Sequence, residues 1–570
     1  MLLTLPDNQM PAVDTSLWRS VTDQSFFARL LTLILFSCLT FTCTYVTAGE
    51  NASFKTIDNG DNKNPSRSTA DHRKFDQLQG PFDIGDISKA CLECHNEASV
   101  QLHATTHWTW EVTNESTGQK LGKRHVANNF LISLPSNYEG CTSCHISFDW
   151  VNDKFDFTSQ EQVDCMICHD TTGTYAVEKF HQDGAKCYVC HDEKLKDSEL
   201  EPVDLADVAQ QVGPTNRKSC GSCHFYGGAA DGAKHGDLDS SLADPVKAVD
   251  VHMDANGLNF TCATCHRTGQ HVVTGSRYDQ RPSDLEGIDV MQGGHGTCPS
   301  CHGLEPMKDH KLNEHTDKIA CQTCHIPMFA KGGVATKMEW DWSTAGKRAR
   351  RGRPITTKDD NDRVIYSSQK GDTTWGENVV PDYIWFNGSV SYTLPSDKID
   401  PTNAVPINTY EGDASDPGSR IFPVKVASGM QPYDTKNMTL ALPRLIGRKK
   451  DAYWTGYNWD KALKSGMKMA GMPFSGEFDF VKTEMLWPIN HMVAPVEESL
   501  VCVDCHSRGG RMADIKGIYI PGRDLNPLVE IAGIGLLGAA LFGVFIHSFL
   551  RVVFHIMRNR SSKTSRRGRP

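Results

Sequence analysis

Positive charge is scarce in this sequence of 570 residues. Its 59 lysines and arginines face 69 aspartates and glutamates, which gives a formal net charge of −10. Seven of the basic residues lie in the last 20 positions, so residues 1–550 carry a charge of −17. An acidic surface repels the phosphate backbone of nucleic acids, and the composition therefore excludes a nucleic-acid partner.

Cysteine is almost absent outside one five-residue pattern, Cys-x-x-Cys-His. Only Cys38 and Cys43 of the 20 cysteines stand outside its nine copies. Two cysteines three positions apart can add across the two vinyl groups of one porphyrin, and the next histidine then lies under the iron as its proximal ligand. The pattern therefore predicts covalently bound haem c, and closely spaced haems serve to move electrons.

The nine motifs define a large set of predicted haem-binding residues. The predicted thioether cysteines are Cys91, Cys94, Cys141, Cys144, Cys165, Cys168, Cys187, Cys190, Cys220, Cys223, Cys262, Cys265, Cys298, Cys301, Cys321, Cys324, Cys502 and Cys505. The predicted proximal iron ligands are His95, His145, His169, His191, His224, His266, His302, His325 and His506. Zinc is the alternative for a Cys-x-x-Cys pair, but the histidine directly after every copy argues against it.

The spacing of the motifs is irregular, which excludes a tandem repeat. Eight of them crowd into residues 85–326, about one per 30 residues, and long regular elements do not fit at that density. We therefore expect a mainly α fold with extensive loops and little sheet, packed around the haems. Residues 327–512 contain no motif before the ninth, at Cys502. We expect this stretch to be a cap on the haem core, with one or two helices near its end.

Both ends of the chain have the composition of membrane-directed segments. Residues 1–48 predict a cleaved secretion signal, followed by a polar segment at 49–84; an uncleaved anchor is the alternative. After a linker at 513–527, residues 528–550 are apolar enough to span a bilayer as a helix. The tail at 551–570 has seven basic residues and no acidic one, so we expect it in the cytoplasm and the haem domain in the bacterial periplasm.

Histidines outside the motifs decide which haems bind substrate. An iron held by two histidines only transfers electrons, whereas an open or weakly held sixth position can bind a small molecule. Twelve histidines remain after the proximal ligands and the two near the apolar segment are set aside. His295 and His315 are well placed to cap neighbouring haems. No copy reads Cys-x-x-Cys-Lys, so a lysine ligand of the pentahaem nitrite reductase kind is not encoded locally, although a lysine from elsewhere could coordinate.

The segments between the motifs resemble the tetrathionate reductase family of octahaem c-type cytochromes. The resemblance covers about residues 70–512. The matching segments are ADHRKFDQLQGPF (70–82), KACLECH (89–95), THWTW (106–110), VDCMICHDTTGTY (163–175), CGSCHFYGG (220–228), KHGDLDSSL (234–242), NFTCATCH (259–266), IACQTCHIP (319–327), WDWSTAG (340–346) and CHSRGGRM (505–512).

This resemblance implies a periplasmic reductase related to the hydroxylamine oxidoreductase group, with one haem capped by a lysine. Lys179 is the first candidate for that lysine and Lys154 the second. Asp170, His107 and Glu111 are the candidate proton donors near such a haem. The sequence has nine motifs where the family name implies eight haems, so either one haem is additional or one motif is empty. Homo-oligomers occur in the wider group, which leaves a homo-oligomer open here.

Three functions follow from these features. The first is a membrane-anchored reductase of tetrathionate, nitrite or hydroxylamine that takes electrons from a quinol-oxidising membrane partner. The second is a non-catalytic conduit between the quinone pool and a periplasmic partner, in which every iron is saturated. The third is the same site working in reverse as an oxidase of hydroxylamine or a sulfur compound. An open or lysine-capped iron distinguishes the second from the other two.

Overall fold

The computed structural model describes residues 70–130, 133–175, 203–227, 230–278, 280, 282–283 and 296–566. The predicted signal at 1–48, the motif at 187–191, Lys179 and His295 lie outside these residues. Residues 65–570 form one compact unit.

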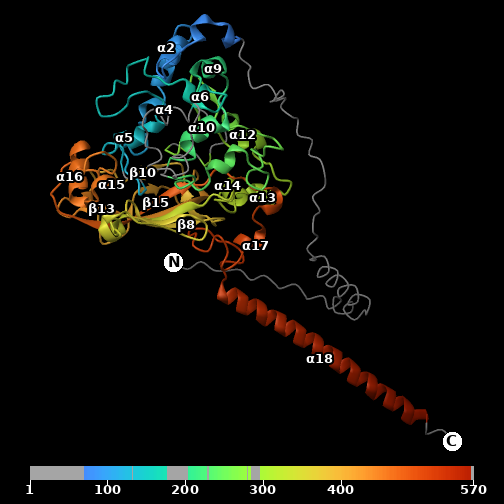
Figure 1. The fold of residues 1–570 in the computed structure, drawn as a ribbon. Coiled ribbons are helices and arrows are strands. Elements are labelled where there is room, and N and C mark those ends of the chain that lie inside the picture. Colours follow the sequence, from blue (N-terminus) through green and yellow to red (C-terminus); the bar gives the residue numbers. More distant parts are fainter. Residues whose placement is uncertain are drawn as a thin grey trace, which may run out of the picture. The chain divides into compact units, whose positions relative to one another are not determined.

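Short helices characterise the part of the chain that carries the first eight motifs (Figure 1). All the described motifs lie at least partly on a helical turn, because the thiols of positions i and i+3 must point to one side. Polar side chains fix several helix starts: Asp204 accepts amide bonds at one helix and Asn216 forms a capping box at the next. The helices are α2 (Asp86–Leu92), α3 (Ala98–His103), α4 (Thr106–Thr109), α5 (Tyr138–Cys141), α6 (Met166–His169), α9 (Leu205–Gln210), α10 (Arg217–His224), α11 (Cys262–Cys265), α12 (Pro299–His302), α13 (His310–His315) and α14 (Cys321–His325).

A nine-stranded sheet forms most of the region between the eighth and ninth motifs. Its main path runs β11-β15-β13-β5-β8-β7-β6, and β9 and β14 also pair with β13. Strand β13 pairs antiparallel with β15 from Val424–Pro488 to Asp434–Phe478, and parallel with β5 around Gly429–Trp340. The strands of this sheet are β5 (Thr336–Asp341), β6 (Thr356–Lys358), β7 (Val364–Ser367), β8 (Gly371–Gly376), β9 (Asp382–Phe386), β11 (Val405–Pro406), β13 (Arg420–Asp434), β14 (Thr439–Leu440) and β15 (Phe478–Pro488).

The remaining strands form small ribbons, and a few helices complete the region. Three two-stranded ribbons pair β1 (Val112–Thr113) with β2 (Lys120–Leu121), β3 (Thr268–Gly269) with β4 (Val272–Val273), and β10 (Val390–Tyr392) with β12 (Asn408–Tyr410). The later helices are α15 (Tyr453–Gly456), α16 (Trp459–Met469), α17 (Cys502–Cys505) and α18 (Pro527–Arg566).

The expectation of a mainly α fold with little sheet was wrong. The sheet arises where the chain carries no haem motif and is rich in β-branched and aromatic residues, which favour strands. Strand β15, for example, alternates in burial from Val481 to Trp487. The expected helices near the end of this region are present as α15 and α16, but β15 follows them. The density of motifs therefore predicted the short helices of residues 85–326, but it carried no information about the secondary structure of residues 327–500.

The core of the sheet region consists of large aromatic side chains. Trp340 and Trp342 are fully buried and stack with ring centroids 4.6 Å apart, and Phe130 from the haem-motif region lies 5.9 Å from Trp340. Polar contacts join the same two regions. The side-chain amide of Asn129 donates to the carbonyl of Ala427 on β13 at 2.6 Å. The sheet therefore packs directly on the chain that carries the haem motifs.

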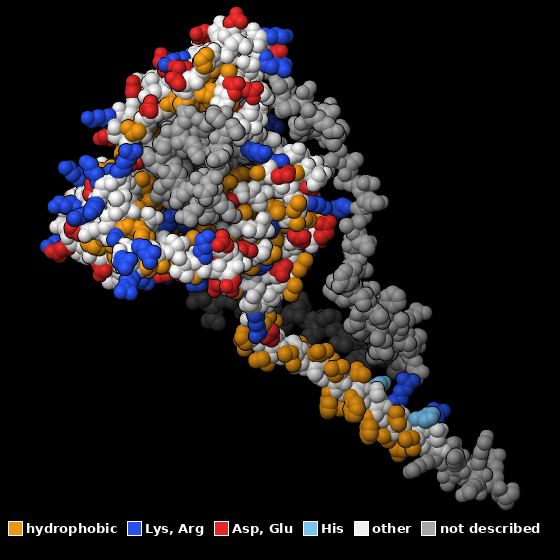
Figure 2. All heavy atoms as spheres, in the orientation of Figure 1, with side chains coloured by type: hydrophobic (Ala, Val, Ile, Leu, Met, Phe, Trp, Pro, Cys, Tyr) orange, Lys and Arg blue, Asp and Glu red, His pale blue; other side chains and the backbone are white. Residues whose placement is uncertain are grey.

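Helix α18 is long and apolar enough to cross a membrane, by length and composition. Its apolar side chains, which include Leu536, Leu541 and Phe545, are exposed along its length (Figure 2). A helix whose apolar side chains are exposed in this way suits lipid rather than water.

Candidate haem array and buried cationic pocket

Histidines from distant parts of the chain face one another in pairs across a gap of constant width. A bond from a metal to an imidazole nitrogen is about 2 Å long, so two imidazoles on opposite sides of one iron have ring centroids about 6 Å apart. Among the residues that the structure describes, six pairs meet this distance. They are His72–His95 at 6.3 Å, His107–His224 at 6.1 Å, His169–His271 at 6.4 Å, His252–His302 at 5.9 Å, His266–His491 at 6.2 Å and His315–His506 at 6.2 Å.

Each of these pairs contains one proximal histidine of a motif and one histidine from outside the motifs. The residues therefore fit six haems with two histidine ligands each. His315, which was predicted as a ligand, lies opposite His506, and its role as a ligand remains a prediction. His325 is not in one of the six pairs, and the other predicted ligand, His295, lies outside the described residues.

The second ring nitrogen of several paired histidines is fixed by an acceptor. Nδ1 of His169, His266 and His506 lies 2.9, 2.8 and 2.9 Å from a backbone carbonyl oxygen. A carbonyl accepts and never donates, so Nδ1 carries the proton and Nε2 keeps its lone pair for a metal. Asp237 fills the same position for His491, with its carboxylate 3.2 Å from Nδ1. These contacts orient the rings for coordination.

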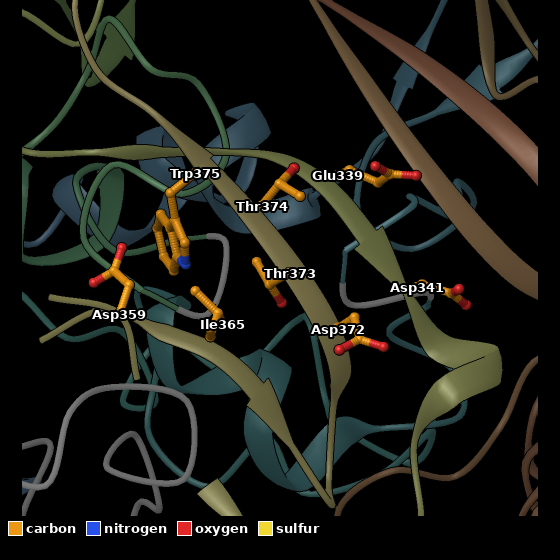
Figure 3. A pocket seen from close by; sticks show the side chains of 8 residues that line it. All are labelled: Glu339, Asp341, Asp359, Ile365, Asp372, Thr373, Thr374 and Trp375. Atoms are coloured by element: carbon orange, nitrogen blue, oxygen red, sulfur yellow. The ribbon is translucent and has the colours of Figure 1, made fainter. Parts of the chain in front are cut away.

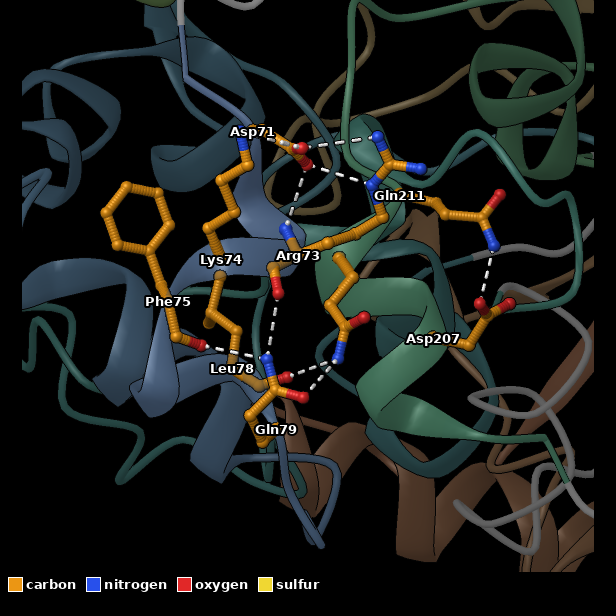
Figure 4. A network of polar contacts seen from close by, with 9 residues as sticks. Asp71, Arg73, Lys74, Phe75, Leu78, Gln79, Asp207 and Gln211 are labelled. Carbon is orange, nitrogen blue, oxygen red and sulfur yellow. Dashed lines mark hydrogen bonds and ion pairs between the residues drawn. The ribbon is translucent and has the colours of Figure 1, made fainter.

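A polar network holds the first of these ligands in place (Figure 4). His72 lies in a 3-10 turn whose start is capped by Asp71. The side-chain amide of Gln79 donates to the carbonyls of Arg73 and Phe75, at 3.0 and 3.2 Å. The network reaches helix α9, where Gln210 donates to the carbonyl of Leu78 at 2.9 Å. Segment 70–79 is thus anchored beside the motif that it completes.

A cationic cluster of Lys234, Arg277 and His235 lies around the buried ring of Trp487. Lys234 is 9% exposed, and its Nζ stands 5.0 Å from the centroid of Trp487. The guanidinium of Arg277 lies 4.8 Å from the same ring, and the His235 ring packs edge-on at 4.9 Å. Burial lowers the pKa of Lys234 well below its usual range, and the neighbouring charge of Arg277 lowers it further. The cluster therefore combines the amine of Lys234, whose neutral form is favoured, with the positive charge of Arg277.

Two tyrosines, Tyr278 and Tyr392, lie next to Arg277 in this cluster. The guanidinium of Arg277 donates to the hydroxyl of Tyr278 at 2.5 Å, and the Tyr278 ring lies 5.5 Å from that of Tyr392. Burial raises the pKa of Tyr392 to about 12, so this hydroxyl keeps its proton. A small anion bound beside this cluster would meet positive charge and several O–H or N–H donors.

Lys234 differs from the two other buried lysines among the described residues, both of which lie on strands of the sheet. The Nζ of Lys425 donates to the carbonyls of Ala233 and Lys234, each at 3.1 Å, and to Thr336. Lys337 lies over the ring of Trp340 at 3.8 Å. Lys425 therefore holds the backbone that presents Lys234. Sequence reasoning missed Lys234, although it begins a segment, KHGDLDSSL, that was already singled out.

The predicted catalytic residues that the structure describes have separate contacts. Lys154 is exposed and Lys179 lies outside the described residues. The carboxylate of Asp170 is buried and accepts the backbone amides of Thr172, Gly173 and Tyr175, which favours a structural role in that turn.

The two other candidates have different partners. His107 faces His224, which favours iron ligation over proton transfer. Glu111 bonds to His125 and to Lys120 on the neighbouring chain segment. The roles predicted for Lys179, Asp170 and His107 remain predictions.

A separate cavity on the sheet has the wrong charge for an anionic substrate (Figure 3). Its volume is about 550 Å³, and its lining includes Glu339, Asp341, Asp359 and Asp372. Four carboxylates repel an oxyanion, so the cationic cluster at Lys234 is the better candidate for the site that binds substrate.

The paired histidines and the motif helices define a multihaem c-type cytochrome, with a function in electron transfer or redox chemistry. Comparisons agree. Residues 337–509 match the family described as bacterial cytochrome c. The octahaem cytochrome c of Shewanella oneidensis is 40% identical, with a TM-score of 0.67, over 79% of this chain and 97% of that chain. No curated protein matches the sequence. The chain belongs to the multihaem c-type cytochromes.

Proposed function

We propose that this protein is a membrane-anchored periplasmic reductase of small oxidised sulfur or nitrogen compounds such as tetrathionate, nitrite or hydroxylamine. The observation that carries the proposal is the cationic cluster of Lys234, Arg277 and His235 around Trp487, in which Lys234 and Trp487 are buried. Keeping the positive charge of Arg277 beside the buried Lys234 costs free energy, which a bound anion would offset. Such a cluster is therefore suited to an anionic substrate rather than to a purely structural role.

Lys234, rather than Lys179 or Lys154, supplies the lysine that caps one haem iron in this proposal. Its burial favours the neutral amine, which is the form that coordinates a metal. Haem c bound at the motifs supplies electrons. Arg277 attracts and orients the substrate, and His235 and the hydroxyls of Tyr278 and Tyr392 hydrogen-bond to it while its nitrogen or sulfur atoms are reduced.

Helix α18 and the basic tail set the cellular context of this proposal. The helix anchors the protein, the tail lies in the cytoplasm by the positive-inside rule, and the haem domain lies in the periplasm. Electrons then come from a quinol-oxidising membrane partner. The protein has nine motifs and its relative is an octahaem cytochrome, so we expect eight or nine haems.

A non-catalytic electron conduit is the second candidate, and the six histidine pairs favour it. An iron with two histidines has no position for substrate. The two candidates differ in one property, which is whether any iron responds to an added ligand. An oxidase would share the catalytic iron and would differ in the direction of electron flow.

Electron paramagnetic resonance of the oxidised, detergent-solubilised full-length protein tests the proposal, with and without nitrite and tetrathionate. We expect one signal that differs from those of bis-histidine haem and that shifts when a ligand is added. In Lys234→Met this signal should change, and reduced-viologen oxidation should fall about a hundredfold, the size expected for a lost catalytic group. Lys154→Met, a change of an exposed lysine, is the matched control and should behave as the wild type.

Two results would contradict the proposal. Signals that all belong to bis-histidine haems and that ignore both ligands, together with no turnover of any substrate, would leave the conduit. Full activity in Lys234→Met would reject Lys234 as the capping residue.

A further inference from the structure

We propose that the haem of the ninth motif, Cys502–His506, is the site at which electrons from the membrane enter this protein. The electrons then pass through the haems of the eighth, seventh, sixth and fifth motifs to the second motif, beside Lys234. This inference rests on the membrane anchor and the quinol-oxidising partner of the proposed function, but on no particular substrate. Each quinol that the partner oxidises to quinone releases two electrons and two protons, and each electron reduces one ferric haem iron to the ferrous state.

The ninth motif is connected to the start of the membrane helix over a short distance. His506 lies 21 positions before Pro527, where α18 begins. Nδ1 of His506 lies 2.9 Å from the carbonyl oxygen of Pro521. The chain from Pro521 to Pro527 can span at most about 20 Å, even when it is fully extended. An ion pair at 3.8 Å also joins Arg508 to Glu530, in the first turn of α18. The ninth motif is therefore held near the membrane surface.

The segment between this motif and α18 is packed against the sheet. Met512, Ile515 and Ile520 are buried in one cluster with Ile421 of β13. The guanidinium of Arg523 donates to the carbonyl of Met512 at 2.6 Å. Apolar contacts and hydrogen-bonded carbonyls together fix the path of the segment. The position of the ninth motif next to the membrane helix is therefore set by the fold.

The eighth motif lies directly beside the ninth. The amide of Leu500 donates to the carbonyl of Cys324 at 3.0 Å, which joins the two motifs through the backbone. His315, six residues before Cys321, faces His506 with ring centroids 6.2 Å apart. The chain that leads into the eighth motif therefore also lines the ninth. An electron on the ninth haem meets the eighth haem next.

Pairs of cysteines connect neighbouring motifs farther along the route. The side chains of Cys298 and Cys321 lie within hydrogen-bonding distance, which joins the seventh motif to the eighth. The side chains of Cys220 and Cys262 join the fifth motif to the sixth in the same way. A thioether bond attaches each of these sulfur atoms to the edge of a porphyrin, so neighbouring sulfur atoms bring the edges of two haems together. Such closeness favours electron transfer.

Backbone contacts complete the route. The carbonyl of His252, which faces the histidine of the seventh motif, accepts from the amide of Phe260 at 2.9 Å, just before the sixth motif. In the fifth motif, Sγ of Cys223 lies 3.7 Å from the carbonyl oxygen of Cys144 in the second. Cys144 in turn interacts electrostatically with Lys234. The contacts therefore form one continuous path from the membrane helix to the cationic cluster.

Two histidines on helix α13 provide a matched test. His315, at the end of the helix, faces His506, whereas His310, at its start, is exposed and pairs with Glu314 at 3.2 Å. The full-length protein stays in membranes of the cells that produce it, and menadiol is added as the quinol without oxygen. Stopped-flow absorption follows the reduction of haem c. Methionine as an iron ligand raises the reduction potential of a haem, so His315→Met should hold the electron on the ninth haem.

We expect two phases in His315→Met, in which one haem is reduced early and the others about tenfold more slowly than in the wild type. His310→Met should follow the wild-type time course, and dithionite should reduce every haem in both variants. A wild-type time course in His315→Met would overturn the proposal.

A second variant removes the entry haem itself. Cys502→Ser with Cys505→Ser should lose one haem per chain, measured as pyridine haemochrome, and menadiol should reduce the remaining haems about tenfold more slowly. Reduction at the wild-type rate would contradict the proposal. If menadiol does not reduce even the wild-type protein, the membrane donor is rejected, and this inference with it. Slow reduction of both variants of a protein that turns over neither nitrite nor tetrathionate would support the entry site and reject only the reductase.

Discussion

The two halves of the haem domain form their cores from different materials, haem groups in one and side chains in the other. Residues 85–326 carry eight motifs, and the longest helix described there, α10, has eight residues. Residues 327–500 carry none, and their strand β13 alone runs for 15 residues at the centre of a sheet. A chain that wraps apolar prosthetic groups needs few regular elements of its own. A chain without them must bury its own side chains, and a sheet with an aromatic core is one of the stable ways to do so.

This comparison predicts that the first half depends on haem for folding. Replacing Cys165 and Cys168 by Ser removes one attachment site at helix α6, next to the buried Met166 and Ile167. We expect this change to have the largest effect, a nearly complete loss of folded holoprotein, because the surrounding short helices lose the haem against which they pack. Yield of haem-stained protein and protease resistance measure it. Wild-type yield and resistance would mean that side chains alone suffice in this half.

The sheet region should depend on side-chain packing in the ordinary way. Trp340→Ala removes a fully buried ring that stacks on Trp342, and such a change costs about 3–5 kcal/mol of stability. We expect a lower midpoint of guanidinium unfolding with an unchanged haem absorption spectrum. A changed spectrum in the folded protein would show that this core also positions the haems, and would weaken the contrast between the halves.

Lys425 tests the contact between the two halves. Its amine donates to the carbonyls of Ala233 and Lys234, so Lys425→Met removes one donor from each of these two carbonyls, at a cost of about 1–3 kcal/mol. If Lys425 positions Lys234, reductase activity should fall about tenfold while the haem count stays the same, in line with losses at groups that orient a ligand. Lys482→Met, an exposed change on the neighbouring strand β15, is the control. Unchanged activity in a destabilised Lys425→Met would show a structural role only.

The smallest expected effect concerns Asp434, at the end of β13, and depends on pH. Burial alone would raise its pKa, but hydrogen bonds from the amides of Ser475, Asn437 and Lys436 lower the pKa to about 2. The ordinary value is about 4, so the carboxylate adds stability above about pH 4 and loses it as the pH falls toward 2. Asp434→Asn should therefore cost about 1–2 kcal/mol at pH 7.

Unfolding midpoints of this variant and the wild type, measured from pH 7 to pH 2.5, test the last prediction. The difference between them should shrink as the pH falls. A difference that is constant over this range would assign the loss to side-chain geometry instead of charge.

Local patterns predicted the chemistry of this protein and part of its architecture. Cys-x-x-Cys-His predicted haem c, motif density predicted short helices in residues 85–326, and the run from Leu528 to Phe549 predicted a helix long enough to span a membrane. The sheet was missed because its strands pair across the sequence. Strand β5 joins β13 in register around Trp340 and Gly429, and no local signal encodes that pairing.

The sequence by itself determined which residues can attach a haem, because that chemistry needs only five consecutive residues. Tertiary structure decided which histidine faces which, as with His266 and His491, and which lysine is buried beside an arginine. It also decided that His145 lies against aromatic rings such as that of Trp150, whereas His169, in a motif of the same type, faces His271. The physical reason is that ligation, burial and tautomer depend on groups far away in the chain, which come together only when it folds.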